Sequence, residues 1–203
     1  SNYYDTLRKW NESGLIEVWH HGYYHSYFNS DGEPWAEGDG GKNGEYVLSY
    51  DKQLASFKAT YDLLKENAGI EVRSFGAPFN ATDDTTVKML NENYPGVKVV
   101  MTALAPADLP QYTVTPGFMH LTNRIHVESV TGVFSDFDAF KQTFTEKLDD
   151  DYIVIQMHGG LWWTINSQRT EEQFTRFTQM VDFMKESGAT FMTPYGYYLE
   201  CQQ

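Results

Sequence analysis

Cysteine is almost absent from this chain of 203 residues, which contains only Cys201. A single cysteine excludes an internal disulfide framework and a zinc site built from cysteines. Long hydrophobic runs are also missing, and none approaches the roughly 20 apolar residues that a membrane-spanning helix requires. Residues 1–10 lack the apolar segment of a secretory signal peptide. The composition therefore indicates a globular chain, and its length fits one domain over residues 1–203.

Basic residues are scarce as well. The 15 Lys and Arg face 28 Asp and Glu, so the formal net charge is −13 and a nucleic-acid backbone would be repelled. Aromatic residues, in contrast, are abundant, with 14 Tyr and 5 Trp. Exposed aromatic rings offer flat faces for sugars, although most aromatic residues of a globular protein belong to its core. The composition thus excludes nucleic acid as an expected partner and leaves carbohydrate open.

Hydrophobic periodicity predicts an alternation of strands and helices. Apolar residues at helical spacing predict helices over residues 50–67, 137–148 and 171–187. Short apolar or β-branched runs predict strands at 15–19, 71–75, 97–102, 125–127, 152–157 and 189–193. This alternation is typical of a parallel sheet with crossover helices, as an open α/β sheet or a (β/α) barrel.

Side chains that favour helix ends accompany the three predicted helices. Ser49, Ser135 and Thr170 stand where N-caps are expected, the last two followed three residues later by Asp138 and Gln173. Gly69 and Gly188 follow the first and third helices, where glycine commonly ends a helix.

Polar and Gly- or Pro-rich clusters follow three of the predicted strands. HHGYYH follows residues 15–19, GAPFN follows 71–75, and HGGLWW comes at the end of 152–157. In parallel α/β sheets and barrels, the reactive groups gather at the carboxyl ends of the strands. We therefore expect these three clusters to lie close together and to form the functional site.

Histidine is concentrated in the first of these clusters, which holds three of the six histidines. His21 and His25 are four residues apart, so both imidazoles can point at one metal ion. His20 would face the opposite side if the strand continues through it, which favours a structural or supporting role. His120 and His126 are expected to be ordinary surface or groove-edge histidines.

The three clusters, in this order, resemble the motifs of the NodB-like polysaccharide deacetylases, which are metal-dependent carbohydrate esterases. The family's His-x-x-x-His motif is matched by His21 and His25, and its groove-wall motif by Pro78 and Phe79. The family's final apolar strand followed by Leu-His is matched by Ile155-Gln156-Met157-His158, with Trp162 and Trp163 just after it. The resemblance covers about residues 14–195. It implies His21 and His25 as ligands of a divalent metal, expected to be zinc, and His158 as general acid. It also implies that Pro78, Phe79, Trp162 and Trp163 bind substrate.

Two features depart from the family pattern. The family's Asp-Asp motif, which supplies the catalytic base and a third metal ligand, has no match before His21. We therefore expect an irregular (β/α) barrel that lacks its first strand-helix unit and so begins inside the domain. A site completed by a local acid, such as one of Asp31, Glu33, Glu37 and Asp39, and an inactive site are the alternatives. The second departure is Gly76, which stands where the family has an arginine; Arg73 and Arg124 are nearby candidates to replace it.

The expected function is metal-dependent removal of acetyl groups from an oligo- or polysaccharide. Two alternatives remain open: a carbohydrate-binding barrel without catalysis, and a metal hydrolase of a non-sugar amide or ester. Arg124 and Glu128 are expected to form a structural charge pair rather than to act in catalysis. The family resemblance favours a secreted, periplasmic or cell-surface location. The oligomeric state is left open.

Overall fold

The computed structural model describes residues 2–23, 49–78, 84–101, 114–115, 117–130, 133–158 and 171–203. The chain divides into two compact units, Ser1–Thr122 together with Met192–Gln203, and Asn123–Phe191. Both units combine helices with parallel strands, so the chain is a mixed α/β protein. Within the described ranges, no helix is long and apolar enough to cross a membrane.

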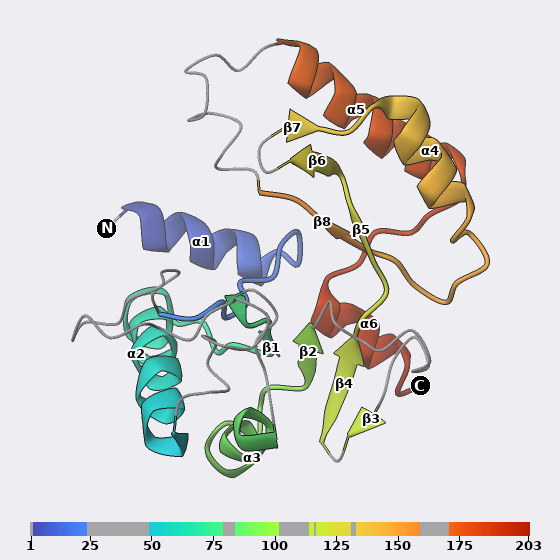
Figure 1. Cartoon of the computed structure of the whole chain (residues 1–203). Coiled ribbons are helices and arrows are strands. Elements are labelled where there is room, and N and C mark those ends of the chain that lie inside the picture. Colours follow the sequence, from blue (N-terminus) through green and yellow to red (C-terminus); the bar gives the residue numbers. More distant parts are fainter. Residues whose placement is uncertain are drawn as a thin grey trace. The chain divides into compact units, whose positions relative to one another are not determined.

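The described residues of the first unit form a four-stranded sheet and four helices, whose arrangement can be followed in Figure 1. The strands are β1 (Ser74–Phe75), β2 (Val99–Met101), β3 (Val114–Thr115) and β4 (Phe118–Leu121), and the helices are α1 (Asn2–Glu12), α2 (Tyr50–Ala68), α3 (Asp84–Asn93) and α6 (Pro194–Glu200). The sheet order is β1-β2-β4-β3, with β1, β2 and β4 parallel and β3 antiparallel to β4. His20 forms a parallel bridge with Phe75, so the segment that leads to the histidine cluster runs beside β1.

The core of this unit lies between the sheet and the helices. Phe57 of α2 and Met89 and Leu90 of α3 are completely buried against the strands. A second cluster joins the end of α2 to the following chain: Leu64, Ala68, Ile70 and Val72, with Tyr4 and Leu7 of α1 packed against it. These contacts hold β1, and with it the strand end that follows, in a defined place.

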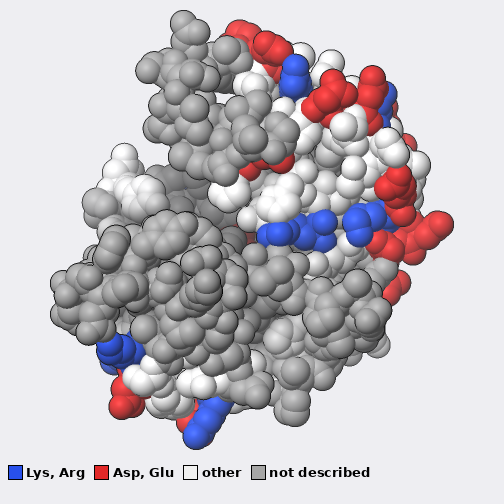
Figure 2. All heavy atoms as spheres, in the orientation of Figure 1, with Lys and Arg blue, Asp and Glu red and all other residues white. Residues whose placement is uncertain are grey.

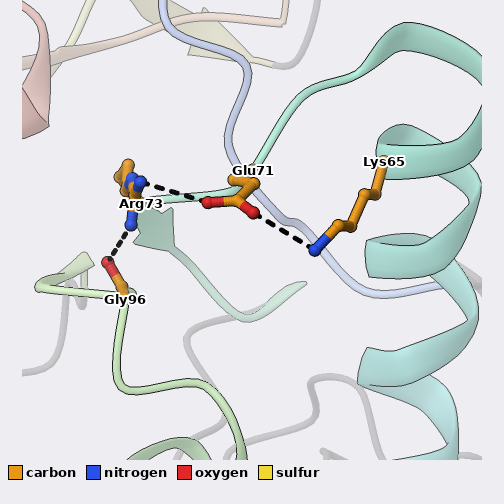
Figure 3. A network of polar contacts seen from close by, with 4 residues as sticks. All are labelled: Lys65, Glu71, Arg73 and Gly96. Carbon is orange, nitrogen blue, oxygen red and sulfur yellow. Dashed lines mark hydrogen bonds and ion pairs between the residues drawn. The ribbon is translucent and has the colours of Figure 1, made fainter.

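A network of polar contacts fastens the chain before β1 (Figure 3). Glu71 accepts hydrogen bonds from Lys65 at 3.1 Å and from Arg73 at 3.2 Å, and Arg73 also donates to the Gly96 carbonyl at 3.5 Å. Lys65, through its hydrogen bond and charge, and then Arg73 lower the pKa of Glu71. Ion pairs as exposed as these contribute little to stability, because water and salt screen them. Arg73, one candidate to replace the family's arginine, therefore lies in a structural network.

In the second unit, the part that the structure describes contains a parallel pair of strands, an antiparallel pair and two helices. Its strands are β5 (Arg124–His126), β6 (Glu128–Val130), β7 (Val133–Phe134) and β8 (Val154–Gln156), and its helices are α4 (Phe137–Thr145) and α5 (Glu171–Glu186). Strand β5 pairs with β8 in parallel, and β6 pairs with β7 in antiparallel orientation. Ile125, Val127 and Phe134 pack on the buried faces of α4 and α5, with Phe140, Phe144, Met180 and Met184. Acidic side chains gather on the visible surface over α4 and α5 (Figure 2).

The three predicted helices are confirmed as α2, α4 and α5. Gly69 ends α2 with a φ of 67°, a conformation in which glycine is favoured. The N-cap of α4 is Asp136 rather than Ser135, because the Asp136 carboxylate accepts from the backbone N–H groups of Asp138 and Ala139. Thr170 lies outside the described residues, and Ser49 begins α2 without a side-chain cap bond.

The predicted strand at residues 189–193 is wrong. These residues have no regular structure, and Phe191 and Met192 are exposed. Thr193 caps α6 instead by accepting from Gly196 N–H, and Pro194 occupies the first helical turn. Among the described residues no sheet closes on itself, so the barrel stays a prediction.

Candidate active site

His20 lies in the core of the first unit. Its side chain is completely buried and stacks on Phe57, with ring centroids 4.0 Å apart and planes 6° from parallel. Nε2–H donates to the Phe57 carbonyl at 3.0 Å, and Nδ1 accepts from Gly22 N–H at 3.1 Å. These two partners require the neutral ring, and burial lowers the pKa of His20 to about 4. Gly22 has a φ of 79°, and its hydrogen bond to His20 fixes the backbone just after the bridge between His20 and Phe75.

His21 is exposed and lies beside Trp19. Its Nδ1 is 2.7 Å from the Gly76 carbonyl oxygen, which can only accept a hydrogen bond, so Nδ1 carries the proton. The lone pair of the neutral ring is then on Nε2. The Trp19 ring meets the His21 ring edge-on, with centroids 5.0 Å apart and planes at 66°. A backbone carbonyl on Nδ1 is the usual support for a histidine that binds metal through Nε2.

Gly76 is enclosed by the tryptophan. A Cβ atom at this position would lie 2.9 Å from Trp19 Cζ3 and 3.5 Å from Met101 Cβ. The arginine that the family resemblance would place here is therefore incompatible with the present position of the Trp19 ring. Pro78, two residues later, is buried, whereas Phe79 lies outside the described residues.

The tautomer of His21 fits a ligand of a divalent metal site, because the proton on Nδ1 places the lone pair of the ring on Nε2. His25 lies outside the described residues, as do the acids of the loop that follows it. The described ranges contain no group of three His, Cys, Asp or Glu side chains that could hold a metal ion. The metal site, including the assignment of His21 as one of its ligands, therefore stays a prediction.

His158, at the end of β8, is held by a buried carboxylate. Glu128 Oε2 lies 2.5 Å from His158 Nδ1, and Glu128 Oε1 accepts from the backbone N–H of His158 at 3.0 Å. The Glu128 side chain is 3% exposed and that of His158 is 39% exposed. One carboxylate thus orients both the backbone and the ring, and it assigns the Nδ1 proton, which leaves Nε2 as the nitrogen that can exchange a proton with a substrate.

The residues before His158 share a polar face of the β5–β8 pair. Arg124 is paired with Val154 and His126 with Gln156, and the intervening Ile125 points into the core. Because side chains alternate along a strand, Arg124 and His126 lie on the face opposite Ile125. Arg124 donates from Nη1 to the Gln156 side-chain oxygen. The predicted Arg124–Glu128 pair is therefore wrong, since Gln156 is the partner of Arg124 and Glu128 binds His158.

Burial and neighbouring charges lower the pKa values of two further histidines. Burial lowers the pKa of His126, with smaller electrostatic contributions from Arg124 and His158, while Glu128 raises it. Burial also lowers the pKa of His120 on β4. Of the remaining predicted site residues, Trp162 and Trp163 lie outside the described residues.

No protein-family model and no curated protein matches the chain. Solved structures do match. The Xyl-CE4 domain of a multidomain xylanase from the hindgut metagenome of Trinervitermes trinervoides superposes with a TM-score of 0.55 at 14% identity, over 100% of this chain and 72% of that one. BA3943, a CE4 family pseudoenzyme from Bacillus anthracis, superposes with a TM-score of 0.51 at 15% identity, over 95% and 50%. The chain has the CE4 fold.

The deacetylase resemblance thus holds at the level of the fold. A weaker similarity, to the BpsB deacetylase domain from Bordetella bronchiseptica, has a TM-score of 0.40 and 21% identity over 59% of this chain. The chain spans about half the length of that domain (47%) and of BA3943 (50%).

Glu128 is the residue whose role sequence reasoning missed. An acid just after the predicted strand at 125–127 was the available signal, because parallel pairing places that strand end beside the end of the His158 strand.

Proposed function

We propose that this chain is a metal-dependent hydrolase that removes acyl groups, acetyl above all, from a carbohydrate. The observation that carries the proposal is the pair formed by His158 and Glu128 at the carboxyl end of β8. A partly exposed imidazole whose ring and backbone N–H both bind a buried carboxylate is suited to proton transfer. The CE4 fold supports this reading.

His158 would act as general acid in this reaction. The protonated ring would donate from Nε2 to the sugar nitrogen or oxygen that leaves when the acyl group is cleaved. Glu128 would hold the ring through Nδ1 and stabilise its positive charge. The bond from Glu128 to the backbone N–H of His158 would keep the strand end from rotating the ring away from the substrate.

His21 and His25 would hold the metal ion, together with a carboxylate from elsewhere in the protein. When bound, a zinc ion supplies a Lewis acid for the acyl carbonyl and lowers the pKa of a coordinated water. The Gly76 carbonyl would fix the orientation of His21, and Trp19, beside it, would offer an aromatic edge to the substrate. The closed barrel and a secreted, periplasmic or cell-surface location belong to the same proposal; fractionation of the source cells tests the location.

A carbohydrate-binding protein without catalysis is the second candidate. It is favoured by the lack of a match to the family's Asp-Asp motif before His21 and by BA3943, whose CE4 fold belongs to a pseudoenzyme. A mutant of BA3943 with restored enzymatic activity has the same fold, at a TM-score of 0.51 and 15% identity. A hydrolase of non-sugar amides or esters is the third candidate. Activity assays on non-sugar substrates would distinguish it from the first two.

The test is acetate release from acetylated amino-sugar oligosaccharides, measured with added zinc and with a chelator. We expect release that requires the metal, falls by at least about 100-fold in His158→Gln, and is retained in His120→Gln as the matched histidine control. Sugar binding by calorimetry that is unaffected by chelator, with no acetate release, would establish the binding protein instead. Release from non-sugar acetyl esters alone would establish the third candidate.

A further inference from the structure

Arg124 differs from the other arginines that the structure describes. Each of the other three lies within ion-pair distance of a carboxylate: Arg8 of Asp5, Arg73 of Glu71, and Arg176 of Glu172. Among the described residues, Arg124 has only the neutral amide of Gln156 as its side-chain partner. A guanidinium carries five N–H donors, so most of the hydrogen-bonding capacity of Arg124 is left for another acceptor.

This exception is notable in a chain whose formal net charge is −13, where acids to pair with are plentiful. Arg124 is also partly buried, and burial lowers its pKa. Removing a guanidinium from water without a counter-charge is unfavourable unless another group compensates. An anion that arrives with a ligand would supply that compensation.

The position of Arg124 relates it to the candidate acid. Its side chain reaches Gln156, which is two residues before His158 on β8. Two residues along a strand span about 7 Å, roughly the length of one sugar ring. His126 lies on the same face, pairs in register with Gln156, and is exposed. Burial, and then the charge of Arg124, lower the pKa of His126, which favours the neutral, hydrogen-bonding form of this imidazole.

We propose that Arg124 and His126 form a subsite for an anionic substituent of the glycan, one sugar away from the bond on which His158 acts. The substituent is an oxyanion, such as a uronic acid carboxylate or a sulfate ester, since the planar guanidinium fork matches two oxygens of either group. The assignment rests on the proposed function for its reference to a glycan. It narrows the substrate class from acetylated carbohydrates in general to acidic ones.

Calorimetry in the presence of chelator tests the subsite without involving catalysis. The probes are a tetrasaccharide of alternating N-acetylated amino sugar and uronic acid, a neutral tetrasaccharide of N-acetylated amino sugars, and the neutral tetrasaccharide carrying sulfate. The proteins are wild type, Arg124→Gln, Arg124→Lys, and Arg176→Gln as the control for loss of a paired arginine in the same unit. The uronic acid and sulfate probes show which oxyanion the subsite takes.

We expect the wild type to bind at least one acidic probe about tenfold or more tightly than the neutral probe. Arg124→Gln should abolish the preference for the acidic probe and change the affinity for the neutral probe by no more than about twofold. Arg124→Lys should retain part of the preference. Arg176→Gln should retain the whole preference. Added salt should weaken only the acidic binding. If Arg124→Gln does not fold, the test uses Arg124→Lys instead, whose preference for the acidic probe should be weaker than that of the wild type.

Equal wild-type affinity for acidic and neutral probes, or no binding of either acidic probe, would overturn the subsite. So would an equal loss on all probes in Arg124→Gln. The proposed function fails separately: an Arg124-dependent preference without acetate release from any probe contradicts the hydrolase and leaves the subsite standing. Acetate release without a charge preference does the reverse.

Discussion

Acid should destabilise this protein through His20. In the folded state burial lowers the pKa of His20 from 6.5 to about 4, and in the unfolded chain the ring titrates at its ordinary value. Between these two pH values the unfolded chain binds a proton that the folded chain does not, so the free energy of unfolding falls as the pH falls. The stabilisation is complete above about pH 6.5 and is lost progressively towards pH 4.

The structure gives the magnitude and the local consequence. A shift of this size corresponds to about 3 kcal/mol in total, of which about 2 kcal/mol is lost between pH 7.5 and pH 5. A protonated His20 would present N–H groups at both Nδ1 and Nε2. The Gly22 N–H that now donates to Nδ1 would then face a second donor. The turn that carries His21 should therefore loosen first.

Urea unfolding between pH 7.5 and pH 5, followed by circular dichroism, measures the effect. The comparison protein is His20→Gln, which cannot titrate and whose amide can still donate to the Phe57 carbonyl. This variant should be less stable than the wild type at pH 7.5. When the pH is lowered to 5, however, its free energy of unfolding should fall by about 2 kcal/mol less than that of the wild type. Parallel stability profiles for the two proteins would refute the reasoning, because the pH dependence would then arise from other groups.

Three further changes test the site. Gly76→Ala places a Cβ 2.9 Å from Trp19 Cζ3, so we expect the free energy of unfolding in urea to fall by about 1–3 kcal/mol. In a Trp19→Leu background most of this loss should disappear. An equal loss in both backgrounds would contradict a clash between the Cβ and the Trp19 ring. Glu128→Gln leaves one side-chain oxygen to accept from the two donors of His158, its backbone N–H and its Nδ1–H. We expect kcat for acetate release to fall by about 10- to 100-fold. An unchanged kcat would show that the pair is only structural. His21→Ala should abolish zinc binding in elemental analysis, and unchanged zinc content would remove His21 from the site.

The sequence by itself determined the class of the fold and where its chemistry should lie. Helices α2, α4 and α5 follow from apolar residues at helical spacing, since an amphipathic helix must bury one face. The histidine cluster and His158 could be selected from the sequence because each directly follows a run of residues typical of a strand, and this order along the chain needs no knowledge of the fold. The motif order also indicated a fold of the NodB-like deacetylase type. The similarity to solved CE4 domains confirms this relationship of the fold, and the closed barrel stays a prediction. The wrong strand prediction at 189–193 shows where sequence patterns stop being specific. A short apolar run also occurs in exposed chain that leads into a capped helix.

Only the tertiary structure decided which side chains meet. Glu128 and His158 are 30 residues apart, and parallel pairing of β5 with β8 is what brings them together. The same holds for His21 and the Gly76 carbonyl, which are 55 residues apart. His20 and His21 are neighbours with the same side chain, yet one is buried and neutral against Phe57 and the other is exposed. Burial and register depend on packing between distant segments, and a sequence pattern reports only what neighbouring residues impose on one another.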